Sequence, residues 1–177
     1  HNSVIKGLGV FYHSCDGVTN IGPDVRNEEN VKKAEKIAEM LERCGFETHV
    51  MEGVQRVLWN KLFLNCGING LTMLTENKMG AVYENPYLWS VCQNLIRECI
   101  EVAKADGTHF TANEVMKKMK NLCVEGATGV TSMYQDRMMH RKTEIDRING
   151  AIVGLAHEYG ISAPYNEMLV QLVHAVE

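Results

Sequence analysis

The feature that most constrains this chain is a long apolar stretch, residues 58–74, in which polar side chains recur at regular intervals. Its apolar residues are spread around all sides of a helix: Leu58, Leu62, Phe63, Leu64, Cys66, Ile68, Leu71 and Leu74. A helix that is apolar on all sides is normally buried in the core of a protein. The stretch therefore predicts a buried helix, extending from about Val54 to Thr75.

Lys61, Asn65 and Asn69 recur at intervals of four residues, which aligns them on one face of this helix. Burying an amine and two amides without partners costs several kcal/mol in total. That face therefore needs either partners within the fold or a polar cleft. Spacing alone leaves both readings open: a lysine that reaches the surface beside asparagines bonded to backbone, or three side chains that line a site.

The chain changes character near Gly53. Before this point the patterns predict a strand over residues 4–13, a turn at 15–17, a short strand ending at 20–22, a charged helix from Glu28 to Cys44 capped by Gly45, and a short strand over 46–51. After it only helical patterns occur, with further helices predicted at residues 86–105, 112–121, 143–159 and 166–176. The expected fold is mostly α, with a small α/β part in front of a helical domain.

Composition excludes several classes of function. The formal net charge of −4 over 177 residues gives no basic surface for nucleic acid. No apolar run reaches the roughly 18 residues of a membrane helix, and no signal peptide is visible. The six cysteines have no C-x-x-C spacing, so neither a metal site nor a thioredoxin-type motif is predicted. Reduced, buried thiols in a cytoplasmic protein are expected.

The segment SMYQDRMMHRKTEIDRING carries two patterns typical of helix N-termini. Ser132 with Gln135, and Thr143 with Asp146, both fit a capping box. These two signals predict a short helix, a break and a longer helix. Taken alone, Ser132 is a helix cap and Glu144 is an exposed first-turn acid that the helix dipole favours.

Four motifs stand in the order and spacing of the ketopantoate (2-dehydropantoate) reductase family, which this chain resembles over its whole length. They are W-x-K-L-x-x-N-x-x-x-N-x-L at 59–71, S-M-x-Q-D at 132–136, T-E-I-D-x-I-N-G at 143–150 and G-I-x-x-P at 160–164. The opening GLGVFYHSCDGVTNIG is similar to the sheet-closing strands of that family's nucleotide domain. The resemblance implies that residues 1–52 end a Rossmann-type sheet. It also implies that residues 53–177 form a helical domain of the 6-phosphogluconate-dehydrogenase-like type, for substrate binding, catalysis and dimerisation.

The family reduces 2-dehydropantoate to pantoate with NADPH, on the route to pantothenate and coenzyme A. By this resemblance Lys61 is the general acid, which stabilises and then protonates the developing alkoxide. Glu144 is the acid that pairs with the lysine and helps to hold the ligands, the cofactor included. Ser132 binds the substrate carboxylate, at a helix start where backbone N–H groups attract anions. Asn65 and Asn69 line the substrate site.

One geometric check limits this reading. Ser132 and Glu144 are twelve residues apart, or about 18 Å along one unbroken helix. A small keto acid cannot easily meet both residues at that separation. The reading therefore predicts a break in the helix before Thr143.

The family's G-x-G-x-x-G dinucleotide loop is absent from this sequence. Gly7-Leu8-Gly9 lacks the third glycine and lies inside a predicted strand. The chain is therefore expected to be a fragment without the ADP-binding half, with little activity alone and NADPH held mainly by the missing part. The alternatives are a reductase for another 2-keto acid and a helical dimerisation module without catalytic duty.

Overall fold

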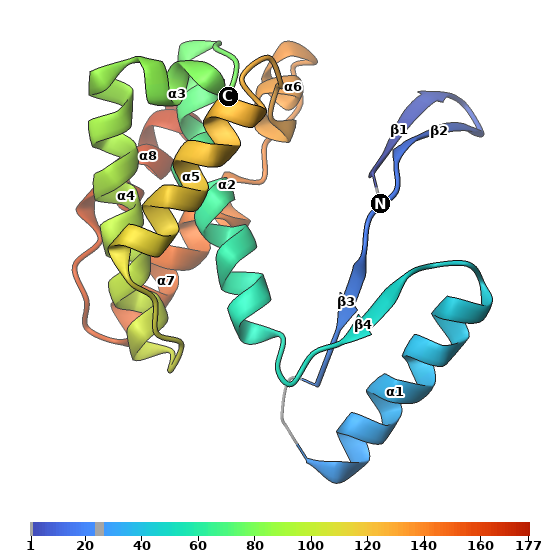
Figure 1. Cartoon of the computed structure of the whole chain (residues 1–177). Helices are drawn as coiled ribbons and strands as arrows, with labels where there is room; N and C mark the ends of the chain where they lie inside the picture. The colour runs from blue at the N-terminus through green and yellow to red at the C-terminus, as the bar shows by residue number, and fades with distance from the viewer. Residues whose placement is uncertain (1, 24–26) are drawn as a thin grey trace. The chain divides into compact units, whose positions relative to one another are not determined.

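The computed structural model describes residues 2–23 and 27–177 and divides the chain into two compact units, His1–Val57 and Leu58–Glu177 (Figure 1). The first unit combines short strands with one helix, and the second is helical. The prediction of a mostly α fold with a small α/β part is confirmed.

The α/β unit contains two separate pairs of strands. β1 (Asn2–Gly7) and β2 (Val10–Cys15) form an antiparallel hairpin, whereas β3 (Thr19–Ile21) pairs in parallel with β4 (Thr48–Val50). The prediction of a single strand over residues 4–13 is therefore wrong. Gly9 has a φ of 71°, in the left-handed region that favours glycine, and this lets the chain reverse between β1 and β2. Gly7-Leu8-Gly9 thus belongs to a hairpin turn.

Helix α1 (Glu28–Arg43) connects the two parallel strands, as a crossover between parallel strands requires. The Asn27 side chain caps its first turn by accepting a hydrogen bond from the backbone of Asn30. Gly45 has a φ of 86° just beyond the last turn, which confirms the predicted C-terminal cap. Ala34 and Ala38 lie on its buried face.

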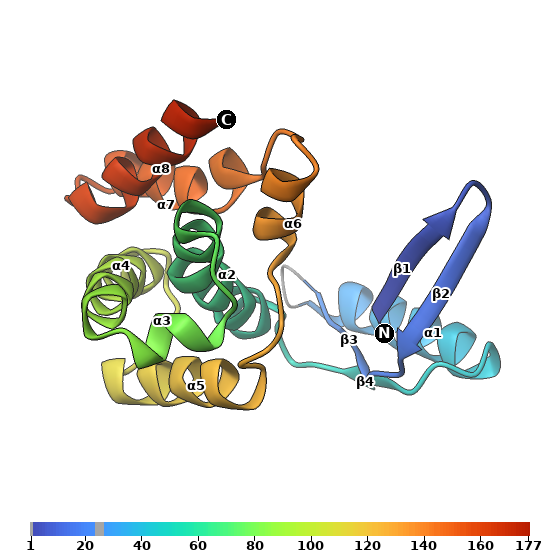
Figure 2. The same ribbon diagram turned by 90° about the horizontal axis from the view of Figure 1, so that it is seen from above.

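The helical unit is built around α2 (Gln55–Thr75), which runs through its middle in Figure 2. The other helices are α3 (Gly80–Glu84), α4 (Pro86–Ala105), α5 (Ala112–Glu125), α6 (Ser132–Met138), α7 (Asn149–Glu158) and α8 (Pro164–Val176), with a 3₁₀ turn η1 at Ile145–Arg147. None of the described helices has the length and apolar character to cross a membrane.

The helix predicted over residues 54–75 is confirmed as α2, but its buried part begins at Trp59, because Leu58 is 59% exposed. Phe63, Ile68 and Met73 are each only 1% exposed. Burial of a large apolar side chain contributes about 1.5–3 kcal/mol, so this helix is a main source of the unit's stability. Gly67 and Gly70 let neighbours come close: a Cβ on Gly67 would meet the side chain of Met119, and one on Gly70 that of Leu169. These contacts pack α5 and α8 directly against α2.

Two predictions of helix extent are wrong. The helix predicted over residues 112–121 continues to Glu125, and the one predicted over 143–159 is divided into η1 and α7. The division lies at Ile148, whose φ of −105° and ψ of −89° do not continue a helix. The predicted break before Thr143 is present, because α6 ends at Met138.

Five cysteines have described side chains, and all five are free thiols. Cys66, Cys92, Cys99 and Cys123 are buried and Cys44 is exposed. Burial raises the pKa of Cys66 and Cys92 well above the usual value, and raises the pKa of Cys123 to about 11. These thiols are therefore protonated and pack as small apolar groups, as expected from the sequence.

A pair of glycine substitutions tests the packing of α2. We expect Gly70→Ala to lower the free energy of unfolding by about 1 kcal/mol or more, because the new methyl overlaps Leu169 and overpacking outweighs the gain in helix propensity. Gly154→Ala is the control: it lies in α7 with open space around it, and should raise stability by about 0.5–1 kcal/mol. Urea denaturation measures both. Equal effects at the two sites would contradict the close approach of α8.

Candidate functional site

The polar face of α2 passes from the surface into the core. Lys61 is exposed, Asn65 is half-buried, and Asn69 is only 7% exposed. Within the described part of the chain, none of these three side chains forms a hydrogen bond or an ion pair. Asparagines bonded to neighbouring backbone, one of the two readings that spacing left open, are therefore not found. An amine and two amides remain available on one face.

The same face continues to Thr72, where it meets the start of α6. The Thr72 hydroxyl donates to the carbonyl of Asn69 at 3.0 Å and lies 2.8 Å from the hydroxyl of Thr131. Because the Thr72 proton is used toward Asn69, Thr131 is the donor of the second bond. Thr131 also caps α6 by accepting from the backbone N–H of Tyr134. Two buried hydroxyls thus fix the start of α6 against the polar face of α2.

Ser132 is the first residue of α6, directly after this anchored threonine. The prediction that Ser132 caps the helix is wrong, because Thr131 occupies that position and only its hydroxyl reaches the backbone of Tyr134. The Ser132 side chain is exposed and makes no hydrogen bond among the described residues. Its hydroxyl is therefore available, one residue beyond the contact with Thr72.

Glu144 lies in the turn before η1, and its side chain is exposed. Its carbonyl accepts hydrogen bonds from the backbone of Arg147 and Ile148, which closes the turn. Among the described residues its carboxylate has no partner. Glu144 is thus the exposed first residue of a compact turn that leads to α7.

The C-terminal residues brace this turn. The Glu177 carboxylate accepts from the backbone N–H and the hydroxyl of Thr143, at 2.8 and 2.6 Å. Thr143 therefore binds the chain terminus, and the predicted capping box with Asp146 is wrong. Asp146 instead contacts His174 at 2.7 Å. Hydrogen bonds with Asp146 and Glu177 raise the pKa of His174. Partial burial acts to raise the pKa of Glu177, but hydrogen bonds from Thr143 outweigh it and lower the pKa.

A buried amide network connects the same turn to the back of α2. Asn149, the first residue of α7, donates from its side-chain amide to the carbonyl of Cys66 at 3.1 Å and to the Asn166 side-chain oxygen at 2.9 Å. Asn166 donates in turn to the carbonyl of Leu95 at 3.2 Å and to Glu98 at 2.7 Å. Both asparagines are fully buried. The network therefore joins α2, α4, α7 and α8.

The orientation of both amides follows from their partners. Each NH₂ group faces two acceptors, so a flipped amide would place oxygen against oxygen. Glu98 completes the arrangement by accepting from the backbone N–H groups of Tyr165 and Asn166 in the first turn of α8. The Asn149 side-chain oxygen is buried and has no partner in the described part of the chain. The directed contacts of Asn149 are therefore made by its NH₂ group.

Sequence reasoning missed the residues that hold these segments, namely Thr72, Thr131, Asn149, Asn166 and Glu98. Thr72 could have been found, since it continues the face of Asn69 by one helical turn. Asn149 and Gly150 fall inside the helix predicted over residues 143–159. Instead Asn149 begins α7, and its side chain reaches the backbone of α2. A Cβ on Gly150 would make only ordinary contacts.

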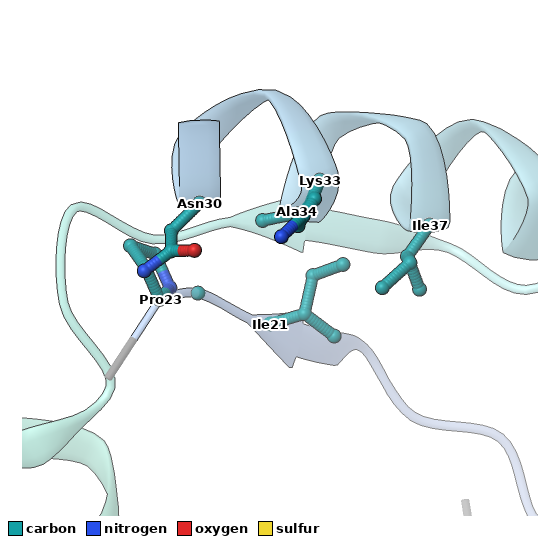
Figure 3. A pocket seen from close by; sticks show the side chains of 7 residues that line it. Ile21, Pro23, Asn30, Lys33, Ala34 and Ile37 are labelled. Atoms are coloured by element: carbon teal, nitrogen blue, oxygen red, sulfur yellow. The ribbon is translucent and has the colours of Figure 1, made fainter. Parts of the chain in front are cut away.

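A hollow of about 440 Å³ lies in the α/β unit, between the end of β3 and α1 (Figure 3). It is lined by Ile21, Gly22, Pro23, Asn30, Lys33, Ala34 and Ile37. Apolar side chains of the strand and the helix face this hollow, and Ile37 is half exposed. It contains none of the residues predicted for catalysis or substrate binding.

Comparison with known proteins identifies the family. A model described as the ketopantoate reductase PanE/ApbA C terminal matches residues 53–177. A 2-dehydropantoate 2-reductase of Archaeoglobus fulgidus is 31% identical over 173 residues, and one of Pyrococcus horikoshii is 33% identical over 179 residues. The chain belongs to the ketopantoate reductase family. It spans 57% and 58% of the length of these two relatives, and 98% and 100% of the chain is aligned.

Solved structures of similar fold include a ketopantoate reductase and a D-mandelate dehydrogenase. The ternary structure of D-mandelate dehydrogenase with NADH and anilino(oxo)acetate has a TM-score of 0.88 and 26% identity, covering 99% of this chain and 57% of that one. A PanE/ApbA family ketopantoate reductase from Ralstonia eutropha has a TM-score of 0.87 and 26% identity, covering 99% and 56%. The fold of this chain is therefore found both in a ketopantoate reductase and in a D-mandelate dehydrogenase.

A matched pair of substitutions tests how α6 is anchored in this ketopantoate reductase family member. We expect Thr131→Val to lower the free energy of unfolding by about 1–2 kcal/mol, because it removes both the helix cap and the bond to Thr72. Ser132→Ala should change stability by less than about 0.5 kcal/mol. Thermal and urea denaturation measure both variants. A larger loss for Ser132→Ala would show that Ser132, not Thr131, is the cap.

Proposed function

We propose that this chain is the catalytic, helical part of an NADPH-dependent reductase that converts 2-dehydropantoate to pantoate, in the biosynthesis of pantothenate and coenzyme A. The observation that carries the proposal is the face of α2. A family member presents an exposed lysine and two asparagines, without partners among the described residues, along a helix whose buried residues run from Trp59 to Met73. A helix that served only the core would have no use for these side chains.

The proposed roles follow from the chemistry of the groups. Reduction of a ketone adds a hydride to carbon and a proton to oxygen. Lys61 stabilises the developing alkoxide and supplies the proton. The Asn65 and Asn69 amides bind oxygens of the keto acid, and the Ser132 hydroxyl donates to its carboxylate. Glu144, which makes no ion pair with Lys61 in this structure, is proposed to pair with its ammonium group when the ligands are bound and to hold the ligands, the cofactor included.

The described residues do not fit the phosphate-binding half of a dinucleotide site. Gly9 is followed by the strand β2, and so no helix N-terminus stands behind Gly7-Leu8-Gly9 to receive a pyrophosphate. The hollow at the end of β3 is lined mainly by apolar side chains and contains the single cation Lys33. We therefore assign binding of the NADPH phosphates to a further part of the reductase, which the greater length of the relatives provides.

A second candidate is a reductase of the same fold for another 2-keto acid. The likeness to D-mandelate dehydrogenase favours it. Comparing kcat/KM of the full-length protein for ketopantoate and for arylglyoxylates decides between the two. At least a tenfold preference for ketopantoate supports the first candidate, and the reverse supports the second.

We also propose that the protein is a cytoplasmic homodimer whose helical domain, residues 53–177, contributes the contact. The outer face of α8 is unusually apolar for an exposed surface, with Tyr165, Met168, Leu172 and Val176 each more than a third exposed. Sedimentation of the full-length protein tests this. A monomer at high concentration would contradict it.

Substitution of Lys61 tests the catalytic proposal. In the full-length protein, we expect Lys61→Ala to lower kcat by about a hundredfold or more. Stability should be unchanged, because the side chain is exposed and unpaired among the described residues. Lys117→Ala, an exposed lysine on α5, is the control and should keep the wild-type rate. A wild-type kcat for Lys61→Ala would refute the assignment and favour a non-catalytic dimerisation module.

The activity of residues 1–177 alone provides an independent test. We expect the purified chain to show little or no NADPH oxidation with ketopantoate, because the groups that bind the phosphates are not among the described residues. The full-length protein at the same molar concentration is the positive control. Robust turnover by the shorter chain would show that this chain holds NADPH by itself.

A further inference from the structure

The turn that carries Glu144 and the helix that carries Lys61 are separate elements, so their relative position has to be fixed by contacts. Glu144 lies in the turn before η1, and Lys61 lies in the first half of α2. The Glu144 side chain itself makes no hydrogen bond among the described residues. The contact that fixes this turn against α2 therefore comes from a neighbouring residue.

Asn149 has the position that such a contact requires. The Glu144 carbonyl accepts from the backbone N–H of Ile148 at 3.1 Å, so Glu144 and Ile148 close one tight turn and Asn149 directly follows it. Asn149 then reaches the carbonyl of Cys66 at 3.1 Å. Cys66 lies at the back of α2 and directly follows Asn65, which lies on the proposed substrate face.

The surroundings allow Asn149 only one arrangement. Its NH₂ group is held between two acceptors, and Asn166 is itself fixed by Leu95 and Glu98. Asn149 is fully buried, and its side-chain oxygen has no partner in the described residues. The NH₂ group of Asn149 thus makes two directed bonds, one to the backbone of α2 and one to the Asn166 side chain on α8.

We propose that Asn149 is a positioning residue of the reductase, whose buried amide sets Glu144 in register with Lys61 and Asn65 by binding the Cys66 carbonyl. The proposal rests on the proposed function. Asn149 itself does not touch the substrate in this scheme, and its effect on catalysis passes through Glu144.

A double-mutant cycle in the full-length reductase tests this coupling. We expect Asn149→Ala to lower kcat/KM for the keto acid about tenfold or more, and Glu144→Gln to lower it further. If Asn149 acts through Glu144, the double variant should fall within about twofold of Glu144→Gln alone. Effects that multiply fully would overturn the proposal.

A substitution at a second buried residue of α7 distinguishes a loss of positioning from a loss of stability. Ile152 is fully buried in the core, and Ile152→Ala also destabilises the helix but leaves the Cys66 contact in place. At a temperature where circular dichroism shows every variant folded, Ile152→Ala should keep kcat/KM within about threefold of wild type. An equal loss in Ile152→Ala and Asn149→Ala would show that Asn149 is merely structural.

A milder variant covers the case in which Asn149→Ala does not fold. Asn149→Ser keeps a small donor, and it should lower kcat/KM and show the same non-additivity with Glu144→Gln. A wild-type kcat/KM for Glu144→Gln would also overturn the positioning role. Lys61→Ala tests the proposed function separately, so the two failures can be told apart.

Discussion

The burial of α2 is the constraint on which the helical unit depends. Its apolar residues face other helices on nearly every side, and Gly67 and Gly70 let side chains of α5 and α8 pack against its backbone. Between Leu62 and Met73, where α2 is most enclosed, its polar side chains follow one line. That line is the face of Lys61, Asn65 and Asn69. Chain segments that meet it have to bring hydrogen-bonding groups, as Thr131 does at Thr72.

The two sides of α2 are held by different chemistry. At the polar face, two hydroxyls fix the start of α6, and the exposed groups remain unpaired among the described residues. At the back, Asn149 and Asn166 form directed bonds within an apolar core. In a low-dielectric interior such bonds are strong, and incomplete pairing is expensive. The bonds of Asn149 and Asn166 thus join α2, α4, α7 and α8 at defined positions.

The sequence predicted the elements whose signals are local. The start of α4 at Pro86 and the end of α1 at Gly45 follow from single residues with fixed conformational preferences. The cap of α6 was misplaced by one residue because Thr131 and Ser132 are both good caps, and only the distant Thr72 favours the first. The partner of Asn149 lies 83 residues away along the chain. No periodicity or capping rule can reveal such a contact. The motifs therefore predict the proposed site residues, but they do not predict the buried residues that hold those segments in place.

The two units differ in how much of their apolar surface and how many of their strand edges are covered. The α/β unit has strands that pair only in twos, and Ile37 and Met40 of α1 are more than half exposed. Pairs of strands are marginally stable without further strands or a covering layer. The helical unit encloses its core, and the hydrogen bonds described for the start of α6 and the turn of Glu144 all lie within it. The contacts that position α6 and the turn of Glu144 against α2 therefore lie within residues 58–177.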